Sequence, residues 1–157
     1  MKYWVLKTVL MEDGVKLSAE PDGGPEDYEY DEGESLLEGF PEDAVMCFDP
    51  NFPEVTKLYD FVDALGNLMV ASDTVKSIFA EAGVDNVEFL PVTLWDHNDK
   101  VVSKNYYILN VLGTVDAIDM EKSEYRMNRI IKDQIKRIKN LVLDKSAIPE
   151  TTKIFRA

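Results

Sequence analysis

The sequence predicts an α+β fold in which one or two helices pack against a mixed, mostly antiparallel sheet. Residues 87–95 and 101–111 are apolar runs separated by a short polar turn, a pattern typical of paired antiparallel strands. Residues 73–82 carry apolar side chains at helical spacing. No fixed-period repeat and no linker divides the chain, so a single domain over residues 1–157 is expected.

The first third of the chain is predicted to hold one strand and a long acidic loop region over about residues 18–56. Residues 3–9 are rich in aromatic and β-branched types, which favour a half-buried strand, and residues 11–14 follow as a turn. Residues 20–34 contain two prolines and three glycines among acids, which indicates a loop. Tyr28 and Tyr30 alternate with acids inside it, which leaves a short edge strand open there.

The middle of the chain predicts a strand–helix–strand core over about residues 66–112. Residues 68–70 are a short buried strand, and Ser72 follows as the helix N-cap. The helix has one apolar face, made of Val75, Ile78, Phe79 and Ala82. Gly83 suits the left-handed conformation that ends a helix. Pro91 donates no hydrogen bond, so a bulge or an edge position is expected in the strand that contains it.

Residues 127–143 fit two predictions. Apolar residues recur nearly at helical spacing, with basic residues on the other face: Met127, Ile130, Ile131, Ile135, Ile138 and Val142. Residues 141–144, with the sequence LVLD, are instead typical of the end of a strand. Periodicity alone leaves both open.

The net charge of −13 is concentrated in one segment. Residues 17–56 hold 13 acidic residues and no Lys or Arg, whereas residues 122–139 hold seven basic residues and two acidic ones. Phosphates would be repelled by the acidic stretch, so nucleic acid is not expected as a partner. A basic protein surface is expected to bind it, and the alternative is a solvated loop that only aids solubility. The candidate contact residues are Asp27, Tyr28, Glu29, Tyr30, Asp31, Glu32 and Glu34.

Catalytic machinery is not expected. His97 lies in a polar turn without a nucleophile nearby in sequence, and Cys47 lies between apolar residues, as a buried thiol would. Asp27, Glu29, Asp31 and Glu38 match four positions of a calcium loop, but Glu32 replaces the glycine that its turn needs. Asp116 and Asp119 are explained as turn residues or, alternatively, as a catalytic pair. No metal or cofactor is therefore predicted.

The single cysteine fits a reducing compartment, and no signal peptide or long apolar span is recognisable. We therefore expect a cytoplasmic protein that does not contact a membrane.

Five short motifs occur in a characteristic order. They are NVEFLPV at residues 86–92, YILNVL at 107–112, VDAIDMEKS at 115–123, LVLD at 141–144 and IFR at 154–156. In this order they resemble immunity protein family eleven of bacterial polymorphic toxin systems, formerly a domain of unknown function. The signature positions are Glu88, Phe89, Pro91, Asn110, Asp116, Asp119, Ser123, Phe155 and Arg156.

The resemblance implies a bacterial protein that binds and blocks a cognate toxin and carries no catalytic residues. It favours a strand at residues 136–143. Family members usually continue beyond the Phe-Arg pair, so this chain is expected to be either a short member or a truncated one. Two other classes stay open: an acidic module or nucleic-acid mimic that inhibits a DNA-binding protein, and an unrecognised enzyme that uses Asp116 and Asp119.

Overall fold

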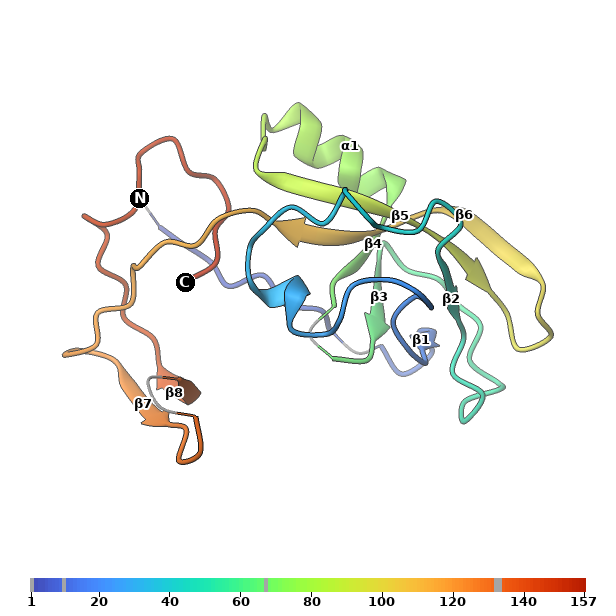
Figure 1. Cartoon of the computed structure of the whole chain (residues 1–157), viewed down its shortest axis with the longest axis horizontal. Helices are drawn as coiled ribbons and strands as arrows, with labels where there is room; N and C mark the ends of the chain where they lie inside the picture. Colours follow the sequence, from blue (N-terminus) through green and yellow to red (C-terminus); the bar gives the residue numbers. More distant parts are fainter. Residues whose placement is uncertain (1, 10, 67, 132–133) are drawn as a thin grey trace. The chain divides into compact units, whose positions relative to one another are not determined.

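A computed structural model describes residues 2–9, 11–66, 68–131 and 134–157 (Figure 1). The chain divides into two compact units, Met1–Gly113 and Thr114–Ala157. Compactness alone does not show whether two units unfold independently. The expectation of a single domain therefore stays a prediction.

A six-stranded sheet forms the centre of the first unit, and its strand order is β1-β3-β4-β6-β5-β2. The strands are β1 (Lys16–Leu17), β2 (Val45–Cys47), β3 (Phe61–Ala64), β4 (Val70–Ser72), β5 (Val87–Trp95) and β6 (Val101–Val111). The outer pairs β1–β3 and β2–β5 are parallel, and the inner pairs are antiparallel. The predicted α+β fold with a mixed, mostly antiparallel sheet is confirmed.

Helix α1 (Asp73–Glu81) begins and ends close to the predicted residues. Ser72 is the N-cap residue, but its hydroxyl donates to Asp60 Oδ1 at 2.6 Å and makes no capping bond. At the other end, Gly83 has φ of 65°, and the amide of Val84 donates to the carbonyl of Phe79 at 2.9 Å. Together with the bond from the Gly83 amide to the Ala80 carbonyl at 2.9 Å, this makes the Schellman motif that commonly closes helices.

The helix covers one face of the sheet through Val75, which packs in a small cluster with Ala71 and Leu109. Phe79 joins this contact, with its ring centroid 5.8 Å from that of Phe89. The prediction that Ile78 shares this face is wrong, because 56% of Ile78 is exposed. A nine-residue helix on a sheet buries a narrow stripe, and here the stripe runs through positions i and i+4.

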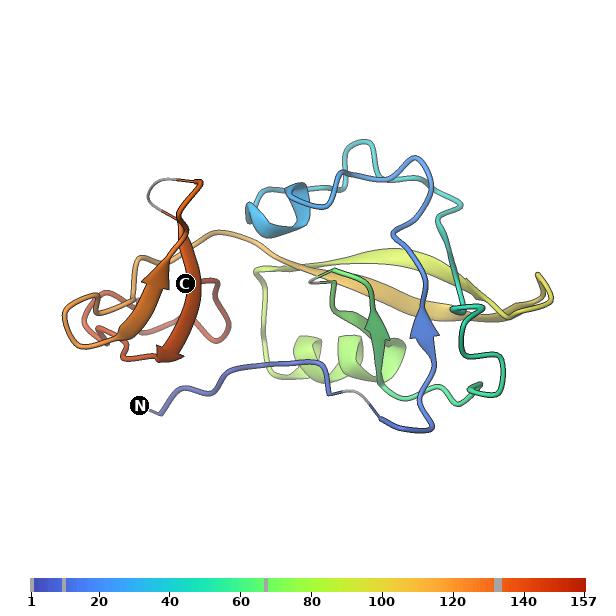
Figure 2. The same cartoon turned by 90° about the horizontal axis from the view of Figure 1, so that it is seen from below.

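The main core lies on the opposite face, as Figures 1 and 2 show by the positions of α1 and the N-terminal loops on either side of β5 and β6. Alternate residues of β5 and β6 point into this core, in accordance with the two-residue period of strands. They meet side chains from the acidic loops. The principal members of this core are Tyr30, Leu36, Met46, Phe48, Leu90, Val92, Leu94 and Ile108.

Two predicted strands in the N-terminal region are wrong. Residues 3–9 form no strand, and Trp4 is 78% exposed, so β1 is the first strand. Strand propensity reflects packing on a half-buried surface, and this segment has no such surface. The edge strand left open at Tyr28 and Tyr30 is replaced by a single 3-10 turn, Glu29–Asp31. The turn at residues 11–14 is confirmed by the bond from the Gly14 amide to the Met11 carbonyl.

Pro91 lies at an edge, as predicted. On one side β5 pairs with β6 along its length, and Pro91 stands opposite Tyr107. On the other side β2 pairs only with Thr93, Leu94 and Trp95, so Pro91 lies beyond the end of β2. No ladder bond is lost there, because proline has no amide hydrogen to donate.

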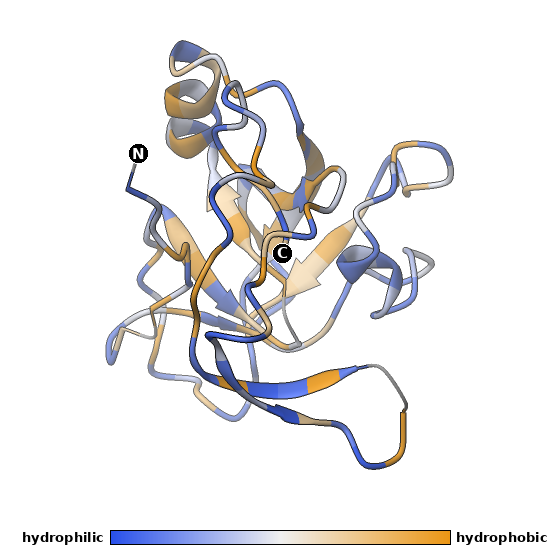
Figure 3. Ribbon diagram, turned by 90° about the vertical axis from the view of Figure 1, so that its left-hand side faces the viewer, coloured by the Kyte–Doolittle hydropathy of each residue, from blue (hydrophilic) through white to orange (hydrophobic). Residues whose placement is uncertain are grey.

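The second unit contains a β-hairpin made of β7 (Glu124–Met127) and β8 (Ile135–Asn140). The strand interpretation of this region is therefore confirmed, and the helical one is wrong; Lys132 and Asp133 lie outside the described residues. Figure 3 shows hydrophilic residues interspersed with hydrophobic ones along the hairpin. Isolated bridges join Thr114 to Arg156 and Ile118 to Leu143.

Within the described residues, no helix has the length and apolar character needed to span a membrane.

Candidate functional site

The most charged surface of the first unit is the acidic segment, defined here as residues 17–56. Most of its carboxylates are exposed: Asp22, Glu26, Asp27, Asp31, Glu32, Glu34, Glu38, Glu42, Asp43 and Glu54. Two large apolar side chains lie among them, Tyr28 at 63% exposure and Leu37 at 59%. An exposed aromatic ring within a field of one sign is typical of a protein-binding surface.

A buried polar cluster attaches the acidic segment to the sheet. Glu88 on β5 accepts hydrogen bonds from the Ser35 hydroxyl at 2.5 Å and from the Leu36 amide at 3.0 Å. Asn110, the cross-strand partner of Glu88 on β6, donates its side-chain amide to Glu88 Oε2 at 3.0 Å and to the Glu34 carbonyl at 2.7 Å. Buried polar groups are costly unless paired, so these bonds hold residues 34–36 in one place.

The anchoring role of Glu88 and Asn110 was not predicted, although the sequence contains a signal for it. Glu88 alternates with Leu90, Val92 and Leu94, so it lies on the buried face of β5. Asn110 is fully buried within an apolar strand. Two polar residues on the core-facing positions of neighbouring strands predict a paired cluster.

A close backbone contact with Gly113 holds Gly33, the residue before Glu34 in the acidic segment. Gly33 has φ of 74°, which favours glycine, and its carbonyl accepts from the Gly113 amide at 2.7 Å. A Cβ atom placed on Gly33 would lie 3.2 Å from backbone atoms of Gly113. The acidic segment is thus fixed on both sides of Glu34.

Tyr30 holds the 3-10 turn against the main core, where its side chain packs and only 4% of it is exposed. Burial, and secondarily the charges of Glu20, Glu29 and Asp27, raise the pKa of its phenol to about 12. Its hydroxyl has no hydrogen-bond partner among the described residues. The ring of Tyr30 belongs to the core, so Tyr28 is the exposed tyrosine of the pair, and the contact role of Tyr30 stays a prediction.

Carboxylates crowd one another beside Tyr30. The pKa of Glu20 is raised, first because its side chain hydrogen-bonds the Asp27 side chain, and also through burial and the charge of Asp27. A hollow of about 200 Å³ lies at the same place. Its lining is Asp27, Tyr28, Tyr30, Asp31, Gly66 and Leu68. Carboxylates this close together repel one another when both are ionised. A cationic group bound nearby would stabilise their charged forms.

The candidate catalytic residues of the first unit lie in structural surroundings. His97 is half-buried, its Nε2 atom lies 3.2 Å from the Asp49 carbonyl, and its ring contacts Phe48 edge-on at 5.5 Å. Burial raises the pKa of the Cys47 thiol, with smaller contributions from Asp99 and Asp22, which disfavours the thiolate that a nucleophile needs. The described residues contain no cluster of three potential metal ligands.

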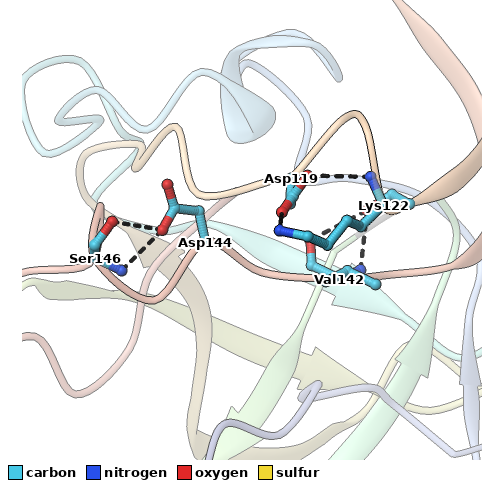
Figure 4. Close-up of polar contacts among 6 residues, drawn as sticks. Asp119, Lys122, Val142, Asp144 and Ser146 are labelled. Carbon is cyan, nitrogen blue, oxygen red and sulfur yellow. Dashed lines mark hydrogen bonds and ion pairs between the residues drawn. The ribbon is translucent and has the colours of Figure 1, made fainter.

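The aspartates of the second unit tie its loops together (Figure 4). Asp119 accepts from the Lys122 ammonium at 2.5 Å and from the Lys122 amide at 3.1 Å, and the side-chain bond lowers the pKa of Asp119. The Ser123 hydroxyl donates to the Val142 carbonyl and accepts from the Val142 amide. Asp116 is exposed and takes no part in these bonds.

Several signature positions are thus explained by structure. Glu88 and Asn110 anchor the acidic segment, the Asp119 side chain closes its own turn through Lys122, Ser123 joins two loops of the second unit through Val142, and the Arg156 carbonyl accepts from the Val115 amide at 2.8 Å. These residues therefore have structural roles in the two units.

Comparison with known families supports the same class. The model of an immunity protein family, Imm11, matches residues 1–151 of the chain. The chain therefore belongs to the Imm11 immunity protein family, as the order of its motifs predicted. No curated protein matches it. Membership indicates a function in immunity to a toxin.

Proposed function

We propose that this protein neutralises a cognate bacterial toxin by binding it directly through the acidic segment, in the cytoplasm of the cell that produces both. The observation that carries the proposal is the anchoring of the segment by Glu88 and Asn110, which presents its carboxylates on a fixed backbone. A surface already held in one conformation loses less entropy when a partner binds.

The charge of the surface specifies the partner. A field of one sign accelerates encounter with a surface of the opposite sign and repels competitors of its own sign. The toxin is therefore expected to carry a basic face. Tyr28 and Leu37 supply apolar contact area inside this field, and Tyr28 is the exposed one of the two tyrosines predicted as contact residues.

Neutralisation by occupancy needs no reacting group. The surroundings of His97, Cys47 and Asp119 agree with this, because each has a hydrogen bond, a packing contact or a pKa shift that suits a structural role. We therefore infer that the protein is not an enzyme and acts without a cofactor.

The proposal is tested by the rate of association with the toxin. Replacing Asp27, Glu29, Asp31 and Glu32 by the matching amides should slow association and flatten its dependence on salt, because surface charges act mainly on the on-rate. The control carries four amides at exposed acids outside the segment: Glu12, Glu81, Asp85 and Asp99. Equal rates for the two variants at low salt, measured by surface plasmon resonance, would refute the acidic segment as the contact.

A second measurement separates packing from charge. Tyr28→Ala should leave the association rate nearly unchanged and accelerate dissociation, because it removes contact area without altering the field. The matched control is Trp4→Ala, an aromatic residue outside the acidic segment that is 78% exposed. The contact role of Tyr28 would be contradicted by identical dissociation rates for the two variants.

A further inference from the structure

The hairpin of β7 and β8 has the opposite charge to the acidic segment. Five of its basic side chains are described and all are exposed: Arg126, Arg129, Lys136, Arg137 and Lys139. Among the described residues of the second unit, none of them forms an ion pair, since the ion pair found there is Lys122–Asp119. The hairpin thus presents basic groups that its own unit leaves without a charged partner.

Two arginines of this hairpin stand directly opposite each other. Arg126 on β7 pairs in register with Arg137 on β8, so both guanidinium groups extend from the same face. Like charges at directly opposed positions destabilise a pair of strands. An arrangement that costs stability is explained if an anionic partner neutralises both groups.

Apolar side chains accompany the charges. Ile130 is 92% exposed and Ile131 54%, and both lie in the connection between β7 and β8. The surface therefore suits a partner that offers anionic groups around apolar ones.

The distribution of charge selects among anionic partners. Seven basic and 23 acidic residues give residues 1–113 a net charge of −16, so a nucleic acid or an anionic bilayer would repel most of the molecule. A toxin with a basic face would repel the hairpin itself. The acidic segment, with Tyr28 and Leu37 exposed among its carboxylates, has the required chemistry.

We propose that the basic hairpin of one copy binds the acidic segment of a second copy. Each chain carries one surface of each kind, so the contact is head-to-tail, and it extends into chains or closes into rings. The same acidic segment is the proposed toxin site, and self-association would therefore compete with toxin binding. Experiments on the protein without toxin test the self-contact independently of the proposed function.

The first experiment measures the mass of the full chain by sedimentation velocity over a range of concentrations. We expect concentration-dependent association at low ionic strength that weakens as salt shortens the screening length to about 10 Å at 0.1 M. Arg126→Glu with Arg137→Glu should weaken association about tenfold or more, because like charges then face the segment. The control, Lys100→Glu with Lys104→Glu, changes the net charge equally on exposed residues of the β5–β6 hairpin and should retain association.

The decisive experiment restores the contact by reversing both charges. A second variant, Glu32→Lys with Glu38→Lys, should also fail to associate with itself. When the two variants are mixed, the two carboxylates introduced into the hairpin of one can pair with the two ammonium groups introduced into the acidic segment of the other, and association should return. Circular dichroism of each variant verifies the fold. A wild-type chain that stays monomeric at low salt, or a mixture that stays monomeric, would overturn the proposal.

Discussion

At the scale of single residues, two buried polar side chains of the first unit fix the backbone conformation of the acidic segment. Glu88 and Asn110 face each other across β5 and β6, and their side chains hydrogen-bond each other and residues 34–36. A carboxylate in this position exchanges hydration for several fixed donors. Its loss would leave buried donors without an acceptor.

Glu88→Ala should therefore destabilise the protein by about 1–3 kcal/mol for each buried donor left unpaired. The amide of Leu36 should exchange its hydrogen faster, because it loses its acceptor. Urea denaturation and hydrogen exchange measure the two effects. Glu81→Ala on the exposed side of α1 is the control and should stay within about 0.5 kcal/mol of the parent. Equal stability of the two variants would contradict the anchoring role of Glu88.

Tyr30 gives a prediction of pH dependence. Its phenol has a pKa of about 12 in the folded protein and an ordinary value near 10 in the unfolded chain, so the folded state holds the proton more tightly. Its contribution to stability is complete below about pH 10 and is lost as the pH rises from about 10 to about 12.

Tyr30→Phe should lose little stability at pH 7, because the hydroxyl has no partner among the described residues. At pH 11 the variant should be more stable than the parent chain. Chemical denaturation at both pH values checks this, with Tyr28→Phe at an exposed position as the control. If the stability of Tyr30→Phe fell between pH 7 and pH 11 as steeply as that of the parent chain, Tyr30 would not be the residue that causes the loss.

At the scale of elements, the sequence was informative where periodicity and end signals agreed. Ser72 and Gly83 bound α1 as predicted, and the turn between β5 and β6 follows from polar residues between two long apolar runs. It was uninformative where burial depends on distant elements. Residues 3–9 have strand propensity but no pairing partner, and Ile78 has helical spacing but lies beside the contact stripe.

The packing of α1 gives the prediction for this scale. Val75→Ala should destabilise the protein by about 2 kcal/mol, because it empties space between the helix and the sheet. Ile78→Ala should change stability by less than about 0.5 kcal/mol, because the side chain is mostly in solvent. Thermal or urea unfolding distinguishes the two. A larger loss for Ile78→Ala would restore the face predicted from periodicity.

The candidate site was predictable in charge but not in detail. The count of acidic residues locates the segment. The average polarity of a stretch of sequence does not show whether Tyr28 or Tyr30 enters the core. Tyr30 is buried and Tyr28 exposed because a 3-10 turn, rather than an extended strand, carries them. The anchoring bonds span more than fifty residues in sequence, so no local pattern contains them.

At the scale of the whole molecule, both hydrophobic clusters belong to residues 1–113. The second unit buries few large apolar side chains among its described residues, with Ile148 the principal one. Stability is expected to be distributed as unevenly as buried apolar area is.

A fragment of residues 1–113 should accordingly fold without the second unit. Its amide resonances should be dispersed, and those of β5 and β6 should match the full chain. The full chain should also lose the β7–β8 hairpin at a lower urea concentration than the six-stranded sheet. An unfolded fragment together with one cooperative transition for the full chain would instead support the single domain that the sequence predicts.

The position of Pro91 affects how readily the protein aggregates in a concentrated solution. Strand β5 is long, apolar and only partly covered by β2, which is the kind of edge that recruits strands from other chains into aggregates. A ring nitrogen in the middle of the uncovered stretch gives an incoming strand no hydrogen to accept. Pro91, which is unusual in a strand, is therefore expected to disfavour fibril growth along this edge of β5. It does so by lacking an amide hydrogen and not by carrying a charge.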